Sequence, residues 1–375
     1  MTEELTIVIG FRNRDIERVK RCLDSLERQT MTAFRLVFVD YGSARPAAEE
    51  VERLVCQYPF CDYIYSETRG YPWNRSHALN TGGRLARSPY LMTTDVDMLF
   101  PPDFLQTFMA RASSDKVLYC SHLFLPQGFA DWENIDSYAG KLRTASKDAL
   151  GACQLVATTI FNEIRGFDEY YRYWGREDRD IHERLLAAGL QAEWLNDQTR
   201  MYHQWHPQRN FKTDGFMPEL LWGSMQMHFW RYKQQLLRND ENWGRILRED
   251  DRPVFAYLDF AQNALRMNKN FLFFDEQPGD IASMGKLAHQ FWQLPSGHAL
   301  GINHAAYPKR SQTTSSLMRY ANHAFKRLGV NIRLGYDRNQ LHTFLIDLMA
   351  NNRELISDYY LDFPAQDGVS VLVRA

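Results

Sequence analysis

The chain has 375 residues, of which 45% are hydrophobic and 24% charged, as is typical of a soluble globular protein with one large domain or two ordinary ones. Its formal net charge of −2, without a basic run, argues against bulk binding of nucleic acid. No apolar run approaches the roughly 18 residues that span a bilayer, so the sequence predicts no transmembrane helix.

Strands and helices alternate along the first part of the chain. Apolar, β-branched runs predict buried strands at 6–9, 36–39 and 62–66. Apolar residues at helical spacing predict helices at 16–26 and from Pro46 to about Tyr58. This alternation is typical of a doubly wound α/β sheet, in which ligands bind at the C-terminal ends of the strands.

An acidic pair follows the next apolar run. Residues 90–92 predict a buried strand that ends at Asp95. Residues two apart in an extended chain point the same way, so Asp95 and Asp97 are expected to converge on one ligand. Two carboxylates at the C-terminal end of a strand supply oxygen ligands and favour a site for Mg²⁺ or Mn²⁺ and for the diphosphate that such a cation holds. A solvated acidic turn is the alternative for such a short motif.

Further elements follow this pair. We expect strands at 117–125 and 192–195, an apolar segment at 155–161, and a mobile loop region at 127–149. Ile181 and Leu185 predict a helix that stops at Gly189 and carries Glu177 and Asp178 in its first turn. The helix dipole favours negative charge there, so a purely structural role is the alternative for these two carboxylates.

The character of the chain changes after about residue 252. A helix is expected at 216–237 before this change. Beyond it, apolar runs alternate with expected helices, which predicts a second, smaller α/β unit. The runs lie at 271–274, 330–334 and 369–373, and the helices at 284–292, 317–328 and 341–351. We therefore divide the chain into residues 1–250 and 251–375, the latter without an assigned role.

Four motifs occur in one order over roughly the first 245 residues: FRNR at 11–14, WNRSHALNTG at 73–82, DVD at 95–97 and WGREDRD at 174–180. His203 follows 25 positions after Asp178, and VDYGS stands at 39–43. Together these motifs resemble the beta-1,4-galactosyltransferases and the related family-2 glycosyltransferases, including the chondroitin-polymerase type, whose YHQ-P stretch is similar to YHQWHP at 202–207. The resemblance implies a GT-A fold, a Rossmann-like, doubly wound mixed sheet, with the smaller α/β domain appended.

The resemblance also implies roles for individual residues. In the donor site, Phe11, Arg12 and Arg14 would line the UDP pocket, Asp40 would read the uracil edge, and Arg75 would reach the nucleotide. In the metal site, Asp97 would ligate Mn²⁺ (or Mg²⁺), Asp95 would face the ribose and the metal shell, and His203 would be a further ligand with His206 as its alternate. In the acceptor site, Trp174 would border both sugars, Glu177 would hold a sugar hydroxyl, and Asp178 would be the catalytic base.

The function implied is that of a metal-dependent, inverting glycosyltransferase. It would move a hexose or N-acetylhexosamine from a UDP-sugar to a glycan acceptor in surface polysaccharide or lipopolysaccharide biosynthesis. Arg176 stands where the galactosyltransferase pattern has Gly, which leaves the nature of the acceptor open. The alternatives are a non-catalytic sugar-nucleotide-binding or scaffold protein, and a nucleotidyltransferase that would release pyrophosphate.

The compartment follows from the cysteines and the N-terminus. The five cysteines are odd in number and show no CxxC spacing, so reduced thiols are expected. The N-terminus carries acidic residues where a signal peptide needs basic ones. We expect a cytoplasmic protein, with peripheral association at the inner face of the membrane and the oligomeric state left open.

Overall fold

The computed structural model describes residues 3–173, 175–207, 219–233, 235–258, 269–274, 281–303, 341, 344–346, 348–349, 352–361 and 369–375. The chain forms two compact units. The first comprises Met1–Arg69, Trp73–Arg209 and Met225–Leu247, and the second comprises Gly70–Pro72, Asn210–Ser224 and Arg248–Ala375.

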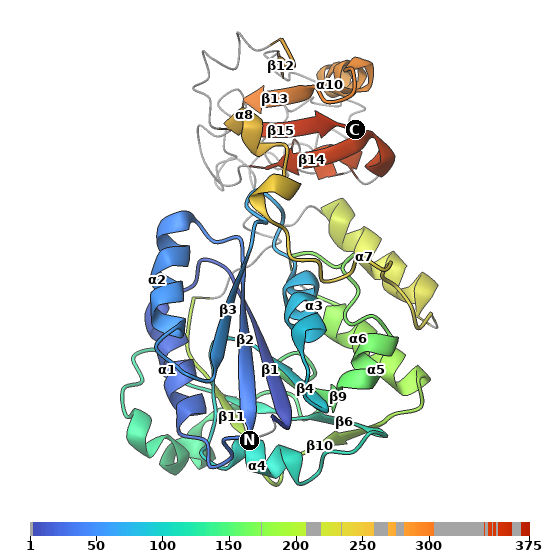
Figure 1. Ribbon diagram of the computed structural model, residues 1–375. Helices are drawn as coiled ribbons and strands as arrows, with labels where there is room; N and C mark the ends of the chain where they lie inside the picture. The colour runs from blue at the N-terminus through green and yellow to red at the C-terminus, as the bar shows by residue number, and fades with distance from the viewer. Residues whose placement is uncertain are drawn as a thin grey trace, which may run out of the picture. The chain divides into compact units, whose positions relative to one another are not determined.

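A seven-stranded sheet forms the centre of the first unit (Figure 1). Its strands, in spatial order, are β10 (Gln191–Trp194), β6 (Lys116–Tyr119), β9 (Cys153–Ala157), β4 (Tyr90–Thr94), β1 (Leu5–Phe11), β2 (Phe34–Tyr41) and β3 (Cys61–Ser66). Strand β9 runs antiparallel to β4 and β6, and the other pairs are parallel. The mixed, doubly wound sheet predicted from the sequence is confirmed.

Alternate residues of the central strands supply two separate cores. Ile7 and Ile9 of β1 contact helices on one face, whereas Val8 faces the other. The first face is covered by α1 (Ile16–Glu27), α2 (Arg45–Val55) and α4 (Phe104–Met109), and the second by α3 (Arg75–Leu85), α5 (Thr158–Glu163) and α6 (Glu177–Ala187) (Figure 1). Burial on both faces explains why these strands read as continuous apolar runs.

The first unit contains a second, smaller sheet, and its strands differ from the sequence prediction for residues 117–125. Its strands, in spatial order, are β5 (Met98–Leu99), β11 (Met201–His203), β7 (His122–Phe124) and β8 (Arg143–Thr144). The single strand expected at 117–125 is divided between β6 and β7, because the backbone N–H of Ser121 donates to the Asn196 side chain (2.7 Å) where the chain changes sheet.

The expected loop region at 127–149 contains a 3₁₀ helix, η1 (Trp132–Lys141), as well as β8. Trp132, Ile135 and Ala139 of this helix recur every three or four residues and contact a small apolar core. That core consists of Leu99, Leu123, Leu125 and Tyr202. Burial of this apolar face orders a segment whose composition suggested a mobile loop.

The second unit contains a four-stranded sheet in the order β12 (Phe271–Phe274), β13 (Ala299–Asn303), β15 (Val369–Arg374) and β14 (Ile356–Tyr360). Other described elements after residue 218 are η2 (Glu249–Asp251), α8 (Phe255–Leu258), α10 (Ile281–Gln293) and η4 (Arg353–Leu355), and also α7 (Glu219–Tyr232), whose residues from Met225 onward belong to the first unit. The strands expected at 271–274 and 369–373 and the helices expected at 216–237 and 284–292 correspond to β12, β15, α7 and α10. The elements expected at 317–328 and 330–334 lie outside the described residues, and the helix at 341–351 is described only in part.

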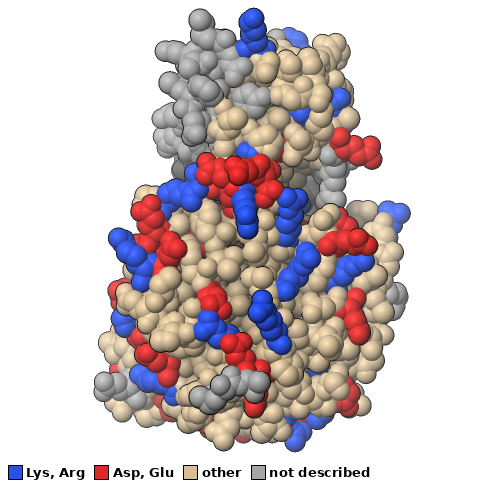
Figure 2. Space-filling model, in the orientation of Figure 1, with Lys and Arg blue, Asp and Glu red and all other residues tan. Residues whose placement is uncertain are grey.

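Charges of both signs are mixed on the face shown in Figure 2, where Lys and Arg side chains lie among Asp and Glu side chains. Within the described residues, none of the helices is both long enough and apolar enough to cross a membrane.

Candidate active site

Asp40 lies at the C-terminal end of β2 and is fully buried. One carboxylate oxygen accepts from the backbone N–H of Ser43 (2.8 Å) and the other from the Tyr63 hydroxyl (3.0 Å). Burial raises the pKa of Asp40, although these bonds and the nearby Arg12 oppose the rise. Each oxygen of an ionised carboxylate accepts more than one hydrogen bond, so Asp40 retains capacity for a further donor.

The side chains of the FRNR segment at 11–14 have different surroundings. The Phe11 side chain faces the core, is 1% exposed and contacts Phe38 with a ring-centroid distance of 5.3 Å. Phe11 lies in the same core as Ile7 and Ile9, on the face of the sheet covered by α1. Its side chain therefore does not line a pocket as expected. The guanidinium of Arg12 lies 5.8 Å from the Tyr41 ring, and that of Arg14 helps to lower the pKa of Asp97.

Asp95 and Asp97 have different partners. Strand β4 ends at Thr94, and residues 96 and 97 form a turn in which Val96 is buried, so the alternation of an extended strand does not apply. Asp95 accepts from Arg75 Nε (2.9 Å), whereas Asp97 faces two histidines. Asp95 is therefore not part of the cluster around Asp97, but the charges of Asp97 and His203 both act on its pKa, so a ligand shared by the two carboxylates stays a prediction.

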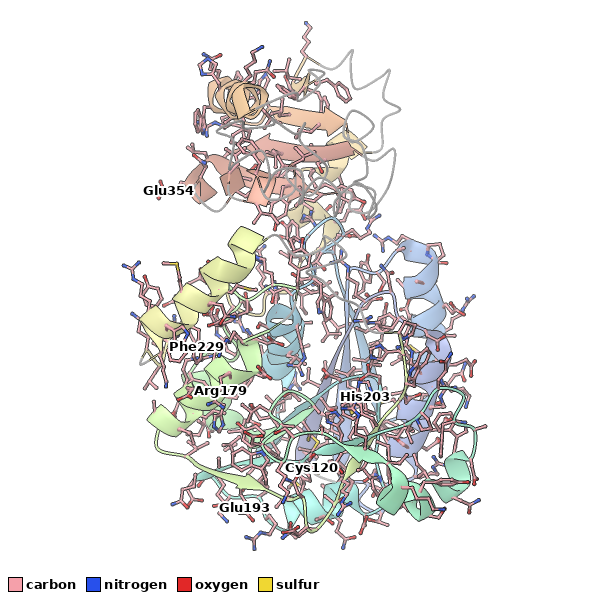
Figure 3. The ribbon with its side chains drawn as sticks, turned by 180° about the vertical axis from the view of Figure 1, so that it is seen from behind. Cys120, Arg179, Glu193, His203, Phe229 and Glu354 are labelled. Atoms are coloured by element: carbon pink, nitrogen blue, oxygen red, sulfur yellow. The ribbon has the colours of Figure 1, made fainter. Side chains whose placement is uncertain are left out.

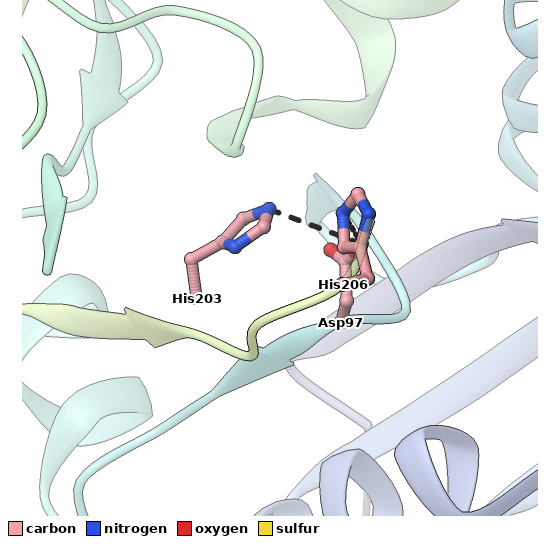
Figure 4. Close-up of side chains that lie close together, drawn as sticks. All are labelled: Asp97, His203 and His206. Carbon is pink, nitrogen blue, oxygen red and sulfur yellow. Dashed lines mark ion pairs between the residues drawn. The ribbon is translucent and has the colours of Figure 1, made fainter. Parts of the chain in front are cut away.

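Asp97, His203 and His206 form the one group, among the described residues, of three or more side chains suited to hold a metal ion. One oxygen or nitrogen atom from each lies within 4.8 Å of those from the other two (Figure 4). Asp97 Oδ2 is 3.3 Å from His206 Nε2 and 3.9 Å from His203 Nε2. Burial would raise the pKa of Asp97, but the His206 hydrogen bond and the charges of His203 and Arg14 lower it.

Strand pairing explains why residues a hundred positions apart meet. β11 runs antiparallel to β5, which sets His203 opposite Met98, next to Asp97. Gln204 fixes the following turn: its backbone N–H donates to the Asp97 carbonyl (2.9 Å), and its side chain bonds Arg21 Nε (2.7 Å) and the Arg18 carbonyl (3.0 Å). His203 and His206 were treated as competitors in the sequence, whereas both approach Asp97. The role of Gln204 was missed, although it stands within YHQWHP.

Arg75 lies near both the acidic turn at Asp95 and the carboxylates at the start of α6. Its guanidinium donates to Asp95 (2.9 Å) and to the Gly151 carbonyl (2.7 Å). Burial would lower the pKa of Arg75, but Asp95, Glu177 and Asp178 together raise it. Arg75 thus lies near three carboxylates and supplies the positive charge that allows them to gather.

Glu177 and Asp178 occupy the first turn of α6, as predicted. Glu177 Oε2 accepts from the Gly175 N–H (3.1 Å), and Asp178 Oδ1 accepts from the Arg179 N–H (2.7 Å). Burial, together with the charge of Asp178, raises the pKa of Glu177 from 4.5 to about 7. The remaining candidate of this segment, Trp174, lies outside the described residues.

The raised pKa of Glu177 predicts an effect on stability. Between pH 4.5 and about 7, the folded state binds more protons at Glu177 than the unfolded state, so stability falls as pH rises through this window. The shift corresponds to on the order of 3 kcal/mol. We expect Glu177→Gln to raise the melting temperature of the apo-protein relative to wild type at pH 8 and to leave it nearly unchanged at pH 4.5. Calorimetric melting at both pH values checks this, and an equal effect at both would contradict it.

Comparison with known proteins adds two family matches. Residues 6–166 match the family described as "Glycosyl transferase family 2", and residues 135–207 match "N-terminal domain of galactosyltransferase". The matches overlap and together extend from β1 to the segment that carries His203 and His206. They therefore include all of the site residues described above.

Three curated proteins are similar over part of the chain. "Validoxylamine A glucosyltransferase" of Streptomyces hygroscopicus subsp. limoneus is 26% identical, over 50% of this chain and 48% of its own length. "N-acetyl-beta-glucosaminyl-glycoprotein 4-beta-N-acetylgalactosaminyltransferase 1" of Mus musculus is 25% identical, over 47% of this chain and 16% of its own length. "Uncharacterized glycosyltransferase YibD" of Escherichia coli K12 is 27% identical, over 35% of each. The chain thus spans about half or less of the length of these relatives.

Among solved structures, that of S. aureus TarS is similar with a TM-score of 0.42 and 13% identity, over 71% of this chain and 51% of that chain.

Proposed function

We propose that this chain, whose residues 6–166 match the family 2 glycosyltransferases, is a metal-dependent, inverting enzyme that transfers a sugar from a UDP-sugar to a glycan hydroxyl. The names of two relatives, a glucosyltransferase and an N-acetylgalactosaminyltransferase, support a hexose or N-acetylhexosamine as the group transferred. We consider UDP-galactose, UDP-N-acetylgalactosamine and UDP-glucose as donors. Surface saccharides are the acceptors that we propose.

The cluster of Asp97, His203 and His206 is the observation that supports metal dependence. Asp97 Oδ1 is buried and has no hydrogen-bond partner among the described residues, which is costly unless a cation or another group satisfies it. The donor set of one carboxylate and two imidazoles fits Mn²⁺ better than Mg²⁺, which prefers oxygen ligands alone. When bound, such a cation supplies Lewis-acid stabilisation to the diphosphate of the leaving UDP.

The remaining residues provide positioning and proton transfer. Arg12 and Arg14 lie after β1 and offer guanidinium groups, whose geometry suits phosphate oxygens. Asp178 serves as the base that takes the proton of the acceptor hydroxyl. The reference pKa of Asp is only about 3.9, but the hydroxyl becomes acidic as its bond to the anomeric carbon forms, so a weak, well-placed base suffices. A single displacement with one base inverts the anomeric configuration.

A donor screen tests this proposal. The protein is incubated with Mn²⁺ and each UDP-sugar without acceptor, and released UDP is quantified. In a parallel reaction it is incubated with Mn²⁺, UTP and a sugar 1-phosphate, and released pyrophosphate is quantified. We expect slow release of UDP from one donor and loss of this release on chelation. Release of pyrophosphate from UTP in the presence of the sugar 1-phosphate would indicate a nucleotidyltransferase. Absence of both products, together with no calorimetric binding of UDP and Mn²⁺, would favour a scaffold protein.

A further inference from the structure

Arg176, directly before the carboxylates of α6, adopts an unusual backbone conformation. Its φ is +78°, in the left-handed region that glycine adopts freely and that costs other residues roughly 1–2 kcal/mol. Arg176 is the N-cap residue of α6, but its side chain makes no capping hydrogen bond. The interactions of this side chain must therefore be sought elsewhere.

The side chain of Arg176 lies against α7. Its Nε donates to Gln226 Oε1 (2.7 Å), and the guanidinium lies 5.0 Å from the Phe229 ring and 5.9 Å from the Trp230 ring. Figure 3 labels Phe229 on α7 and Arg179 on α6, the two helices that these contacts connect. One nitrogen of the guanidinium is thus held, and the aromatic rings fix the plane of the group.

Two donor groups at this position, the Arg176 guanidinium and the Gln226 amide, have nitrogens without an acceptor in the described part of the chain. The terminal nitrogens Nη1 and Nη2 of Arg176 have no hydrogen-bond or ion-pair partner among the described residues, and Gln226 Nε2 is buried without any partner. A buried amide nitrogen without an acceptor is uncommon in proteins and costs about 1–3 kcal/mol. A guanidinium and an amide side by side form a donor-rich site that suits an anion, since a guanidinium fork pairs with two oxygens of a carboxylate or phosphate.

Two neighbouring cations, Arg179 of α6 and Lys233 directly after α7, are already paired. Arg179 and Lys233 both contact Glu183, at 3.4 Å and 3.6 Å. Arg176 differs from them because it has no carboxylate partner in the described part of the chain. Trp230 is 63% exposed and adds an apolar surface beside the guanidinium.

We propose that Arg176 and Gln226 bind an acidic group, a carboxylate or phosphate, carried by the glycan acceptor. This rests on the proposed function, because it takes Asp178 as the base that contacts the acceptor hydroxyl. The Cα atoms of Arg176 and Asp178, two residues apart, are separated by at most about 7 Å. We place the other substituents of a sugar whose hydroxyl reaches Asp178, or those of the adjoining sugar, at the guanidinium. Arg176, where the sequence resemblance places Gly, is a specificity-determining residue for a negatively charged acceptor.

Saturation-transfer NMR without donor tests the proposal with three probes of one scaffold: p-nitrophenyl β-glucoside, its glucuronide and its 6-phosphate. We expect the wild-type protein to bind one or both charged sugars about ten- to a hundredfold more tightly than the glucoside. Arg176→Gly, which relieves the left-handed backbone, should abolish this preference. Arg176→Lys should retain part of it, because it keeps the charge but loses the fork.

Arg179→Gln is the matched control, since it removes a neighbouring cation that is paired with Glu183. We expect its preference to stay within twofold of wild type. Equal binding of charged and neutral sugars by the wild-type protein, binding of none of the three, or an equal loss of all in Arg176→Gly would overturn the proposal; the last result would assign Arg176 a structural role alone. Failure of the proposed function is seen separately, as absence of UDP release in the donor screen.

Discussion

Asp97→Asn is expected to lower kcat/KM for Mn²⁺-dependent release of UDP by about a thousandfold. The amide preserves the shape of the side chain but removes the negative charge that makes Asp97 a metal ligand. Stabilisation of the leaving diphosphate by a cation amounts to several kcal/mol, and each 1.36 kcal/mol is a factor of ten in rate. The backbone carbonyl that accepts from Gln204 is unaffected, so the turn of residues 95–98 should persist.

Asp103→Asn is the control for this substitution. Asp103 is exposed at the start of α4 and makes no capping bond, so its replacement should leave turnover within twofold of wild type. Calorimetric titration of each variant with Mn²⁺ in the presence of UDP provides a readout that does not depend on turnover. Wild-type Mn²⁺ affinity in Asp97→Asn would contradict the assignment of Asp97 as a ligand.

Asp178→Asn should reduce kcat for transfer by about a hundred- to ten-thousandfold, the usual contribution of a general base. The affinity for UDP with Mn²⁺ should stay close to that of wild type, because Asp178 lies on α6 and is not part of the Asp97 cluster. Asp178 Oδ1 accepts a hydrogen bond from the backbone N–H of Arg179. The amide oxygen of the introduced Asn can accept the same bond, so the start of the helix should be preserved. Rapid-quench kinetics with a saturating donor measure the step directly.

Asp197→Asn, at an exposed position outside the site, serves as the comparison. A loss of UDP affinity equal to the loss of rate in Asp178→Asn would show that Asp178 supports the fold of the donor site. Unchanged turnover would remove it from the mechanism.

The architecture could be predicted because the apolar runs in the sequence correspond to the strands that are buried at the centre of the sheet. Ile7, Val8 and Ile9 form a continuous apolar run, and in the structure the run is buried on both faces. The segment 127–149 could not be predicted in this way. Its order depends on a small core that includes Leu99 and Tyr202, and neither residue is near it in the sequence.

The candidate site could be located from the motifs, but its geometry could not. Strand alternation predicted that Asp95 and Asp97 would share a ligand, whereas a turn after Thr94 gives them different partners. The approach of His206 to Asp97 depends on the pairing of β11 with β5 and on the bonds of Gln204. The contact of Arg176 with Gln226 links residues fifty positions apart, for which no sequence spacing is diagnostic.

The most direct test of the proposed metal centre is anomalous diffraction at the manganese edge from crystals grown with Mn²⁺ and UDP. We predict a single strong peak bounded by Asp97, His203 Nε2 and His206 Nε2, with the diphosphate on its open side. A peak at another position, or UDP bound with no peak at these three side chains, would contradict a metal-dependent mechanism at this site.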